Sequence, residues 1–221
     1  MVGSSSSRAA SATLLRFSPS ARALHWALAL PTLALLVSGL PLLFPALRGW
    51  VRGYDAQMGL RLHLALSVFL LAPFFVLLLG DRRRLRVEGG GLLRLAGGDW
   101  RWLPRMPALL LGGRYTAEGV GRYNAGQKLN AWGVLISLAG LTFSGVLLWL
   151  ETPITLLPAL RWLHDALTLV LGMLLVGHIV LATLHPRTRP ALRGMLDGNV
   201  PADWAAIHYP RWTAERERRR P

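Results

Sequence analysis

The chain has 221 residues, a mean hydropathy of +0.38 and a formal net charge of +14, with 25 Lys and Arg against 11 Asp and Glu. This length suits one domain with tails, and the hydropathy excludes a disordered chain. The lack of cysteine excludes disulfide bonds, thiolate zinc sites, iron–sulfur clusters, a thiol nucleophile and covalently attached haem. Without a GxGxxG, GxxxxGK[ST], HExxH or GxSxG motif, a soluble catalytic domain is not expected.

The first residues, 1–17, contain the serine run Ser4–Ser7 and are predicted to be a disordered leader. The apolar stretch that follows is longer than the roughly 7–15 residues of a signal-peptide core, and no small-residue cleavage site follows it. We therefore expect this stretch to remain in the protein as a helix.

Four uncharged stretches have the roughly 20 residues that a helix needs to cross the hydrocarbon core of a membrane. They are Ala23–Leu47, Leu62–Gly80, Leu129–Leu150 and Ala166–Pro186. Ser18 and Pro19 predict the start of the first helix, and Pro73 predicts a kink in the second. The third helix is expected to open near Gln127. The predicted fold class over residues 18–186 is all-α, an integral membrane four-helix bundle.

Positive charge is distributed unevenly along the chain. Of the 25 Lys and Arg, 21 lie before the first stretch, between the second and third, or after the fourth. The positive-inside bias therefore predicts that both termini and the 81–128 loop are cytoplasmic. A basic face toward anionic membrane lipid accounts for the charge, and no nucleic-acid partner is expected. Within the loop, Met106–Leu111 is too short to span, and residues 187–221 are predicted to be a basic, partly flexible cytoplasmic tail.

Four of the six histidines lie in the predicted spans. Ionisable residues at membrane depth are costly and typically mark a site. The first helix runs outward and the second inward, so His25 lies near the inner face and His63 near the outer face. The fourth helix also runs inward, which places His164 near the outer face and His178 toward the inner face. The topology therefore pairs His25 with His178. It pairs His63 with His164 in the same way.

The spacing within the fourth helix supports this pairing. The 14 residues from His164 to His178 rise about 21 Å and turn about 1400°, roughly 40° short of four full turns, so both rings face one side. This pattern is typical of two stacked haems of the non-covalent b type, each held by two imidazoles. The alternative is four separate packing histidines without haem. Asp165 either hydrogen-bonds the outer imidazole or faces water, and His185 is expected at the membrane interface.

A polar stretch with the sequence GRYNAGQK, residues 121–128, precedes the third helix. It is either a helix start with basic interface anchors or a quinone pocket, in which amide and backbone groups bind a carbonyl oxygen. Composition alone favours the helix start. The topology places the stretch near the inner histidine pair.

Together these segments resemble the gamma (cytochrome b) subunit of membrane-bound formate dehydrogenases over roughly residues 16–212. The similar segments are Arg22–Trp26 with Ser38–Gly39, the stretch 121–128, the His164/His178 spacing, and the tail from Arg193–Met195 to His208–Trp212. The stretch 121–128 is the most specific of them. The histidines are shared with the cytochromes b of hydrogenases and thiosulfate reductases.

The resemblance implies two haem b groups and a quinone site. His25 and His178 would hold the cytoplasmic-side haem. His63 and His164 would hold the outer haem. The resemblance further implies the residues that line a quinone site next to the inner haem: Asn124, Gly126, Gln127 and His178.

The resulting hypothesis is an electron-transfer subunit in a bacterial inner membrane. The catalytic (alpha) subunit of a formate dehydrogenase would oxidise formate, and the iron–sulfur (beta) subunit would deliver electrons at the outer face. This chain would not itself oxidise formate; it would pass the electrons through two haems to quinone. Two alternatives remain: a sister subunit of a hydrogenase or thiosulfate reductase, and a haem-free membrane anchor.

Overall fold

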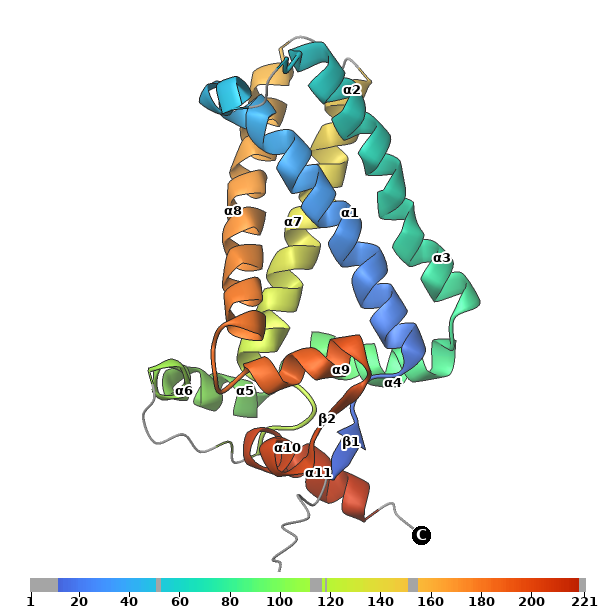
Figure 1. The fold of residues 1–221 in the computed structure, drawn as a ribbon, viewed down its shortest axis with the longest axis vertical. Coiled ribbons are helices and arrows are strands. Elements are labelled where there is room, and N and C mark those ends of the chain that lie inside the picture. Colours follow the sequence, from blue (N-terminus) through green and yellow to red (C-terminus); the bar gives the residue numbers. More distant parts are fainter. Residues whose placement is uncertain (1–11, 51–52, 112–116, 118, 151–154, 219–221) are drawn as a thin grey trace, which may run out of the picture.

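The computed structural model describes residues 12–50, 53–111, 117, 119–150 and 155–218. Its trunk consists of apolar helices that run along the long axis of the molecule (Figure 1). They are α1 (Pro19–Leu43), α2 (Ala56–Ser67) continued by η2 (Val68–Leu71) and α3 (Ala72–Leu79), α7 (Ala125–Trp149) and α8 (Leu157–Thr183). Within the described ranges, four such segments are long and apolar enough to cross a membrane, which confirms the predicted all-α membrane bundle.

Local sequence determines where these helices begin and bend. The Ser18 hydroxyl accepts a hydrogen bond from the backbone N–H of Ala21 at 3.2 Å, which confirms the predicted start of α1. A kink was predicted at Pro73, and the structure has the 3-10 turn η2 just before this residue. Because proline has no N–H to donate, the N–H of Ala72 bonds the carbonyl of Phe69 in a 3-10 turn instead.

The trunk is made of two helical hairpins. In one, α1 packs along α2 and α3, and the short helix η1 (Pro45–Trp50) follows α1. In the other, α7 packs along α8, where a Cβ at Gly133 or Gly140 would overlap a methyl group of Leu174 or Leu167. Small residues thus allow α7 and α8 to approach closely, as is common in membranes.

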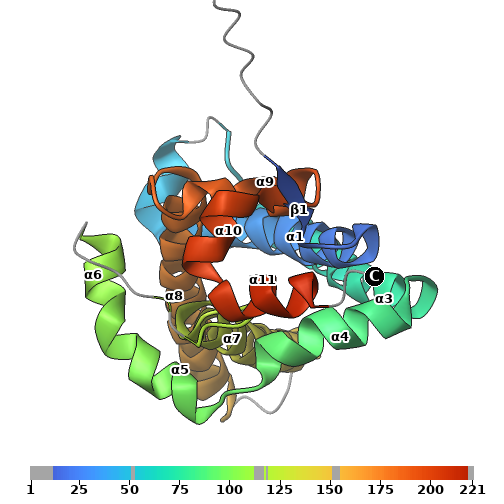
Figure 2. The same cartoon turned by 90° about the horizontal axis from the view of Figure 1, so that it is seen from below.

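The middle segment is more helical than the sequence predicted. It forms α4 (Arg82–Leu93), α5 (Gly97–Trp102), η3 (Leu103–Arg105) and α6 (Met106–Leu110). These helices lie across one end of the trunk (Figure 2). The expected short apolar piece is α6, whereas α4 and α5 were not expected because their arginine and glycine content is typical of a loop.

The predicted disordered leader is wrong for its last residues. Strand β1 (Thr13–Leu15) pairs antiparallel with β2 (Asn199–Pro201), with Leu14 opposite Val200. Arg16 and Phe17, which follow the strand, are buried. Residues 1–11 lie outside the described part of the chain. A partner strand almost 200 residues away leaves no local signal, so the serine-rich composition misled the prediction.

The tail also folds rather than remaining flexible. After α8 it forms η4 (Arg189–Ala191), α9 (Leu192–Leu196), β2, α10 (Ala202–His208) and α11 (Pro210–Glu217). It packs against the middle segment around a buried cluster: Trp102, Leu109, Ala117, Val120, Ala125, Val200, Ala205, Tyr209 and Trp212. We call residues 12–17, 81–111 and 187–218 the cap. The described ends of the chain, in β1 and α11, both lie in it (Figure 1).

One arginine joins the parts of the cap. Arg16 is only 1% exposed, and its guanidinium lies 3.6 Å from the centre of the Tyr209 ring. It also donates a hydrogen bond to the carbonyl of Arg122 at 2.7 Å, and Arg122 forms an ion pair with Glu88 at 3.1 Å. Buried charges with such partners fix the start of α1 to the middle segment and the tail.

Docking of α10 is expected to weaken in acid. Burial lowers the pKa of His208, helped by Arg16 and Arg187 and opposed by its hydrogen bond to the Trp204 carbonyl. The unfolded tail keeps the ordinary pKa of about 6.5 and binds more protons than the folded tail below that pH. The contribution of His208 to stability is therefore full above about pH 6.5 and lost as the pH falls through the lowered folded-state pKa. The rate of limited proteolysis of the tail between pH 7.5 and 5 measures this loss of stability.

The matched variant is His208→Gln, which keeps a polar side chain but cannot titrate. We expect its proteolysis rate to change less between pH 7.5 and 5 than that of the wild type. Equal pH dependence in both proteins would contradict the role of His208.

Candidate haem-binding site

The first pair of histidines lies at the end of the trunk nearest the cap. His25 is in the second turn of α1, and His178 is in the last third of α8. Their ring centres are 6.2 Å apart, with an angle of 52° between the ring planes. Next to His25, the indole N–H of Trp26 donates to the carbonyl of Met195 at 3.0 Å, which ties this part of α1 to the cap. The side chain of His178 is exposed, so a ligand can reach its ring.

The second pair lies toward the opposite end of the trunk. His63 is the eighth residue of α2, and His164 is the eighth residue of α8. Their ring centres are 6.4 Å apart, with an interplanar angle of 76°. Helix α8 therefore supplies one ring to each pair, and α1 and α2 supply the other two. The structure brings the histidines together in the pairs that the topology predicted.

Serine hydroxyl groups hold both rings of this second pair. The hydroxyl of Ser38 lies 2.9 Å from Nδ1 of His63. The hydroxyl of Ser144 lies 2.9 Å from Nδ1 of His164. Neither contact was predicted from the sequence. Asp165, which was predicted either to hydrogen-bond the imidazole or to face water, is exposed. The Ser-Gly dipeptides on α1 and α7 were the available signal.

The geometry of both pairs fits haem iron. An imidazole nitrogen binds a first-row metal at about 2 Å and the ring centre lies roughly 1 Å farther away, so two imidazoles on one metal have ring centres about 6 Å apart. Both observed separations agree with this value. Among the described residues, no group of three or more His, Cys, Asp or Glu gathers as a metal site. Two ligands suffice where a porphyrin supplies the rest, as in haem proteins.

The polar stretch 121–128 begins α7 with a capping box. The side-chain oxygen of Asn124 accepts from the backbone N–H of Gln127 at 2.9 Å, and the side-chain oxygen of Gln127 accepts from the backbone N–H of Asn124 at 3.1 Å. The Gln127 amide also donates to the Tyr209 hydroxyl at 3.2 Å. Gly126 packs beside Trp102. The contacts of the described residues join this stretch to the cap but do not join Asn124 to His178.

The surroundings of the stretch are charged and buried. Lys128 forms an ion pair with Asp99 at 2.8 Å, with both side chains nearly buried. Burial raises the pKa of Tyr123 above its ordinary value, although Arg122 and Arg16 oppose the rise. Tyr123 therefore remains a neutral phenol at physiological pH. The helix-start interpretation of the stretch describes the backbone correctly. A ligand would have to bind the side-chain groups that the capping box does not use.

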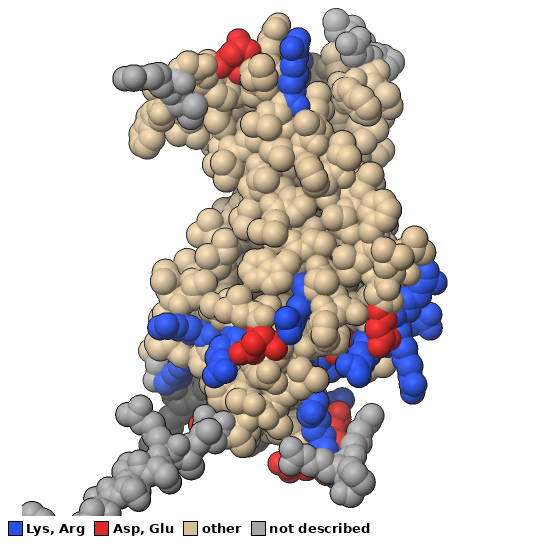
Figure 3. Space-filling view, turned by 45° about the vertical axis from the view of Figure 1, so that its right-hand side comes forward, with Lys and Arg blue, Asp and Glu red and all other residues tan. Residues whose placement is uncertain are grey.

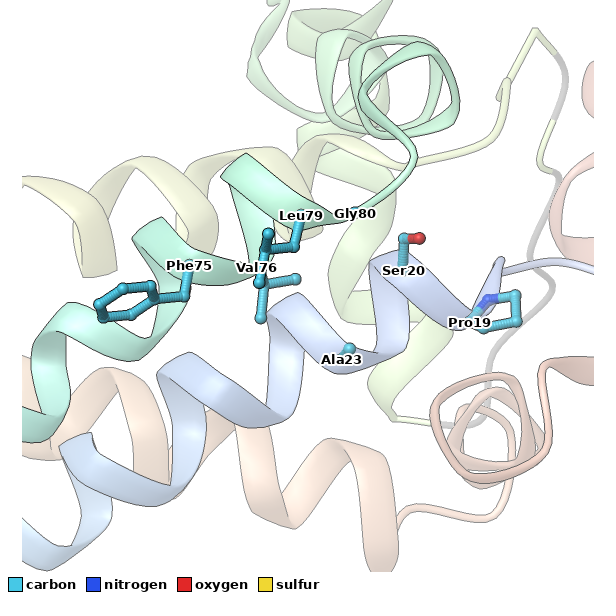
Figure 4. A pocket seen from close by; sticks show the side chains of 7 residues that line it. All are labelled: Pro19, Ser20, Ala23, Phe75, Val76, Leu79 and Gly80. Atoms are coloured by element: carbon cyan, nitrogen blue, oxygen red, sulfur yellow. The ribbon is translucent and has the colours of Figure 1, made fainter.

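Other candidate features lie away from the histidine pairs. The ring of His185 is 3.0 Å from the carbonyl of Leu110, so this histidine links the end of α8 to α6. An open, apolar depression lies between the start of α1 and the end of α3 (Figure 4). None of the predicted haem or quinone residues lines it. Its lining residues are Pro19, Ser20, Ala23, Phe75, Val76, Leu79 and Gly80.

Charge divides the surface into bands. The middle of the trunk carries almost no charged side chain on the face shown in Figure 3, whereas Lys and Arg gather at the cap end. The basic residues belong mainly to 81–111 and the tail from 187 onward. An apolar band between a basic end and a less charged end is the distribution typical of a membrane-spanning protein.

The chain is similar to known membrane cytochromes. The family model for prokaryotic cytochrome b561 matches residues 16–198. The cytochrome b556(Fdn) subunit of the nitrate-inducible formate dehydrogenase of Escherichia coli is 26% identical over 210 residues, which cover 89% of this chain and 88% of that protein. The cytochrome b556(fdo) subunit of formate dehydrogenase from the same species is 28% identical over 210 residues, covering 92% and 93%.

A third relative matches over a shorter length. The formate dehydrogenase cytochrome b556 subunit of Haemophilus influenzae is 30% identical over 122 residues, which cover 53% of this chain and 50% of that protein. The family match includes all four paired histidines and the stretch 121–128.

Proposed function

Because the chain belongs to the prokaryotic cytochrome b561 family, we propose that it is the membrane subunit of a formate dehydrogenase complex and passes electrons from an iron–sulfur partner to quinone. The two formate dehydrogenase subunits of Escherichia coli match 89% and 92% of this chain. The observation that carries the proposal is the presence of two histidine pairs, separated along one apolar trunk, each with the ring separation that a single iron requires.

The four histidines would hold two haem b groups. When bound, haem b supplies one-electron chemistry, because its iron alternates between the ferric and ferrous states. His25 and His178 would hold the haem nearest the cap. His63 and His164 would hold the haem nearest the opposite end. Because α8 carries one ligand of each pair on one face, the two sites are held at a fixed spacing across the membrane.

The charge distribution supports an orientation with the cap in the cytoplasm. Most Lys and Arg lie in the cap, and such an excess is typical of the cytoplasmic side. Both termini are then cytoplasmic, and the His63/His164 pair lies near the outer face. We propose that the iron–sulfur subunit docks at this outer end and that the catalytic subunit reaches the chain through it.

We place the quinone site at the cap end, beside the His25/His178 pair. Its proposed residues are Asn124, Gly126, Gln127 and His178. The capping box uses the side-chain oxygens of Asn124 and Gln127. The amide N–H groups of Asn124, and the one of Gln127 that is not given to Tyr209, are the donors suited to a quinone carbonyl. A site at this end would draw the protons for quinone reduction from the cytoplasmic side.

A difference spectrum of the purified complex, reduced minus oxidised, with haem counted per chain, tests the proposal. We expect b-type absorbance and two haems for each copy of the chain. A complex without pigment would refute the proposal and favour the haem-free anchor. The catalytic subunits that co-purify distinguish a formate dehydrogenase from a hydrogenase or thiosulfate reductase, because the histidines alone do not.

A further inference from the structure

We propose that Ser38 and Ser144 are positioning residues that orient the two ligands of the outer haem and lower its affinity for an electron. The inference rests on the proposed function, since it assigns a role toward the haem held by His63 and His164. It concerns two side chains that touch the imidazoles and not the iron.

The hydrogen bonds of each serine fix the proton of its histidine. A serine hydroxyl has one proton to donate. The Ser144 hydroxyl donates it to the carbonyl of Gly140 at 2.8 Å, one turn earlier in α7. With that proton given to a backbone carbonyl, the hydroxyl accepts from the ring of His164, so that Nδ1 carries the proton and Nε2 keeps its lone pair.

The same accounting holds in the other hairpin. The Ser38 hydroxyl donates to the carbonyl of Leu35 at 3.2 Å and accepts from Nδ1 of His63 at 2.9 Å. Both outer histidines are thus held as the tautomer with a free Nε2, which is the nitrogen left to bind iron.

A glycine next to each serine leaves space for the histidine ring. A Cβ added at Gly39 would lie 3.2 Å from Cε1 of His63, and one added at Gly145 would lie 3.3 Å from Cε1 of His164. Both hairpins therefore have the same arrangement. The first helix carries a Ser-Gly pair, and the second helix carries a histidine at its eighth position. The two hairpins thus position the two rings of one site in the same way.

The inner pair is held differently. Within the described ranges, no side-chain hydrogen bond reaches the ring nitrogens of His25 or His178. His25 instead has the edge-on ring of Trp26 beside it. Removing the serine hydroxyls should therefore change one haem of the two.

A hydrogen-bond acceptor at Nδ1 changes how strongly the imidazole donates electrons, as well as how the ring is oriented. A hydrogen bond from Nδ1–H makes the imidazole a better electron donor to the metal, and such neighbours typically alter metal binding by about 10–100-fold when removed. A stronger donor favours the ferric state. Loss of the acceptor should shift the balance toward the ferrous state, by about tenfold for the pair, which for one electron is about 59 mV upward.

The test is a redox titration of the two b-type components in the intact complex. The variants are Ser38→Ala, Ser144→Ala and the double substitution. We expect one component to move to higher potential, most in the double variant, while the other stays in place. Ser38→Thr restores the hydroxyl and should return the potential toward the wild-type value. The matched control is Thr32→Val, which removes a buried hydroxyl that donates only to the Leu28 carbonyl.

The outcomes separate this inference from the proposed function. Two haems in the double variant with both potentials unchanged would overturn the role of the serines and leave the proposed function intact. Equal shifts of both components, or the same shift in the Thr32→Val control, would also overturn it. A wild-type complex without haem would refute the proposed function itself. Ser144 is fully buried, so the Ser144→Ala complex could fail to assemble. In that case Ser38→Ala and Ser38→Thr test the role of the serines by themselves, because Ser38 is only half-buried.

Discussion

Replacing His178 with alanine is expected to reduce the haem content of the complex from two per chain to one. Alanine leaves His25 as the only ring of its pair, and a site that loses one of its two imidazoles would hold its haem far less tightly. One of the two absorbance components should disappear. Quinone reduction should fall by about 100-fold or more, because the remaining haem lies at the other end of the trunk.

The matched control for this substitution is His185→Ala. This histidine lies seven residues farther along the chain and contacts the Leu110 carbonyl rather than another histidine. Its loss should leave both absorbance components. Formate oxidation with a soluble dye as acceptor should persist in both variants, since we propose that the partner subunits carry out that reaction. Retention of two haems in the His178→Ala complex would refute the ligand assignment.

The pairing of the histidines was predictable because membrane topology limits where a residue can lie. A helix that must cross the membrane fixes the depth of every residue on it, and the spacing of His164 and His178 fixes their common face. Depth and face together leave one arrangement of pairs, and the structure has it. The role of these residues as haem ligands stays a prediction until the haem is counted.

The cap was not predictable in the same way. Its contacts join segments far apart in the chain, such as Leu14 with Val200 or Trp26 with Met195. Nothing in the local composition of residues 13–17 indicates a partner strand, and the buried position of Arg16 contradicts what its charge suggests. Outside the membrane, no membrane normal fixes the position of each residue. Local sequence patterns therefore say less about which segments of the cap contact each other.

The serines illustrate a third case, in which the signal was visible but its meaning was not. Ser38-Gly39 and Ser144-Gly145 lie at similar depth in their helices, and helix packing explains such pairs equally well from sequence. Only the facing of α1 toward α2, and of α7 toward α8, shows that each serine contacts a histidine.

Replacing Asn124 with alanine is expected to weaken the binding of quinone and of quinone-site inhibitors by about tenfold, which corresponds to the loss of one hydrogen bond of about 1.4 kcal/mol. The same change removes the N-cap of α7 and should lower the stability of the complex by about 1 kcal/mol. Both haems should remain, because none of their proposed ligands lies on α7. Inhibitor titration of quinone reduction, together with thermal unfolding, measures the two effects.

Asn124→Ser separates the two roles of this residue. Serine is as good an N-cap as asparagine, so the start of α7 and the unfolding temperature should be retained. It has no amide N–H group, and the hydroxyl proton that it does carry lies on a shorter side chain, so the inhibitor response should weaken toward that of the alanine variant. If the serine variant instead responds to inhibitors like the wild type, Asn124 serves only to begin the helix. In that case the capping box with Gln127 is the whole role of this part of the stretch, and the proposed quinone site at Asn124 is wrong.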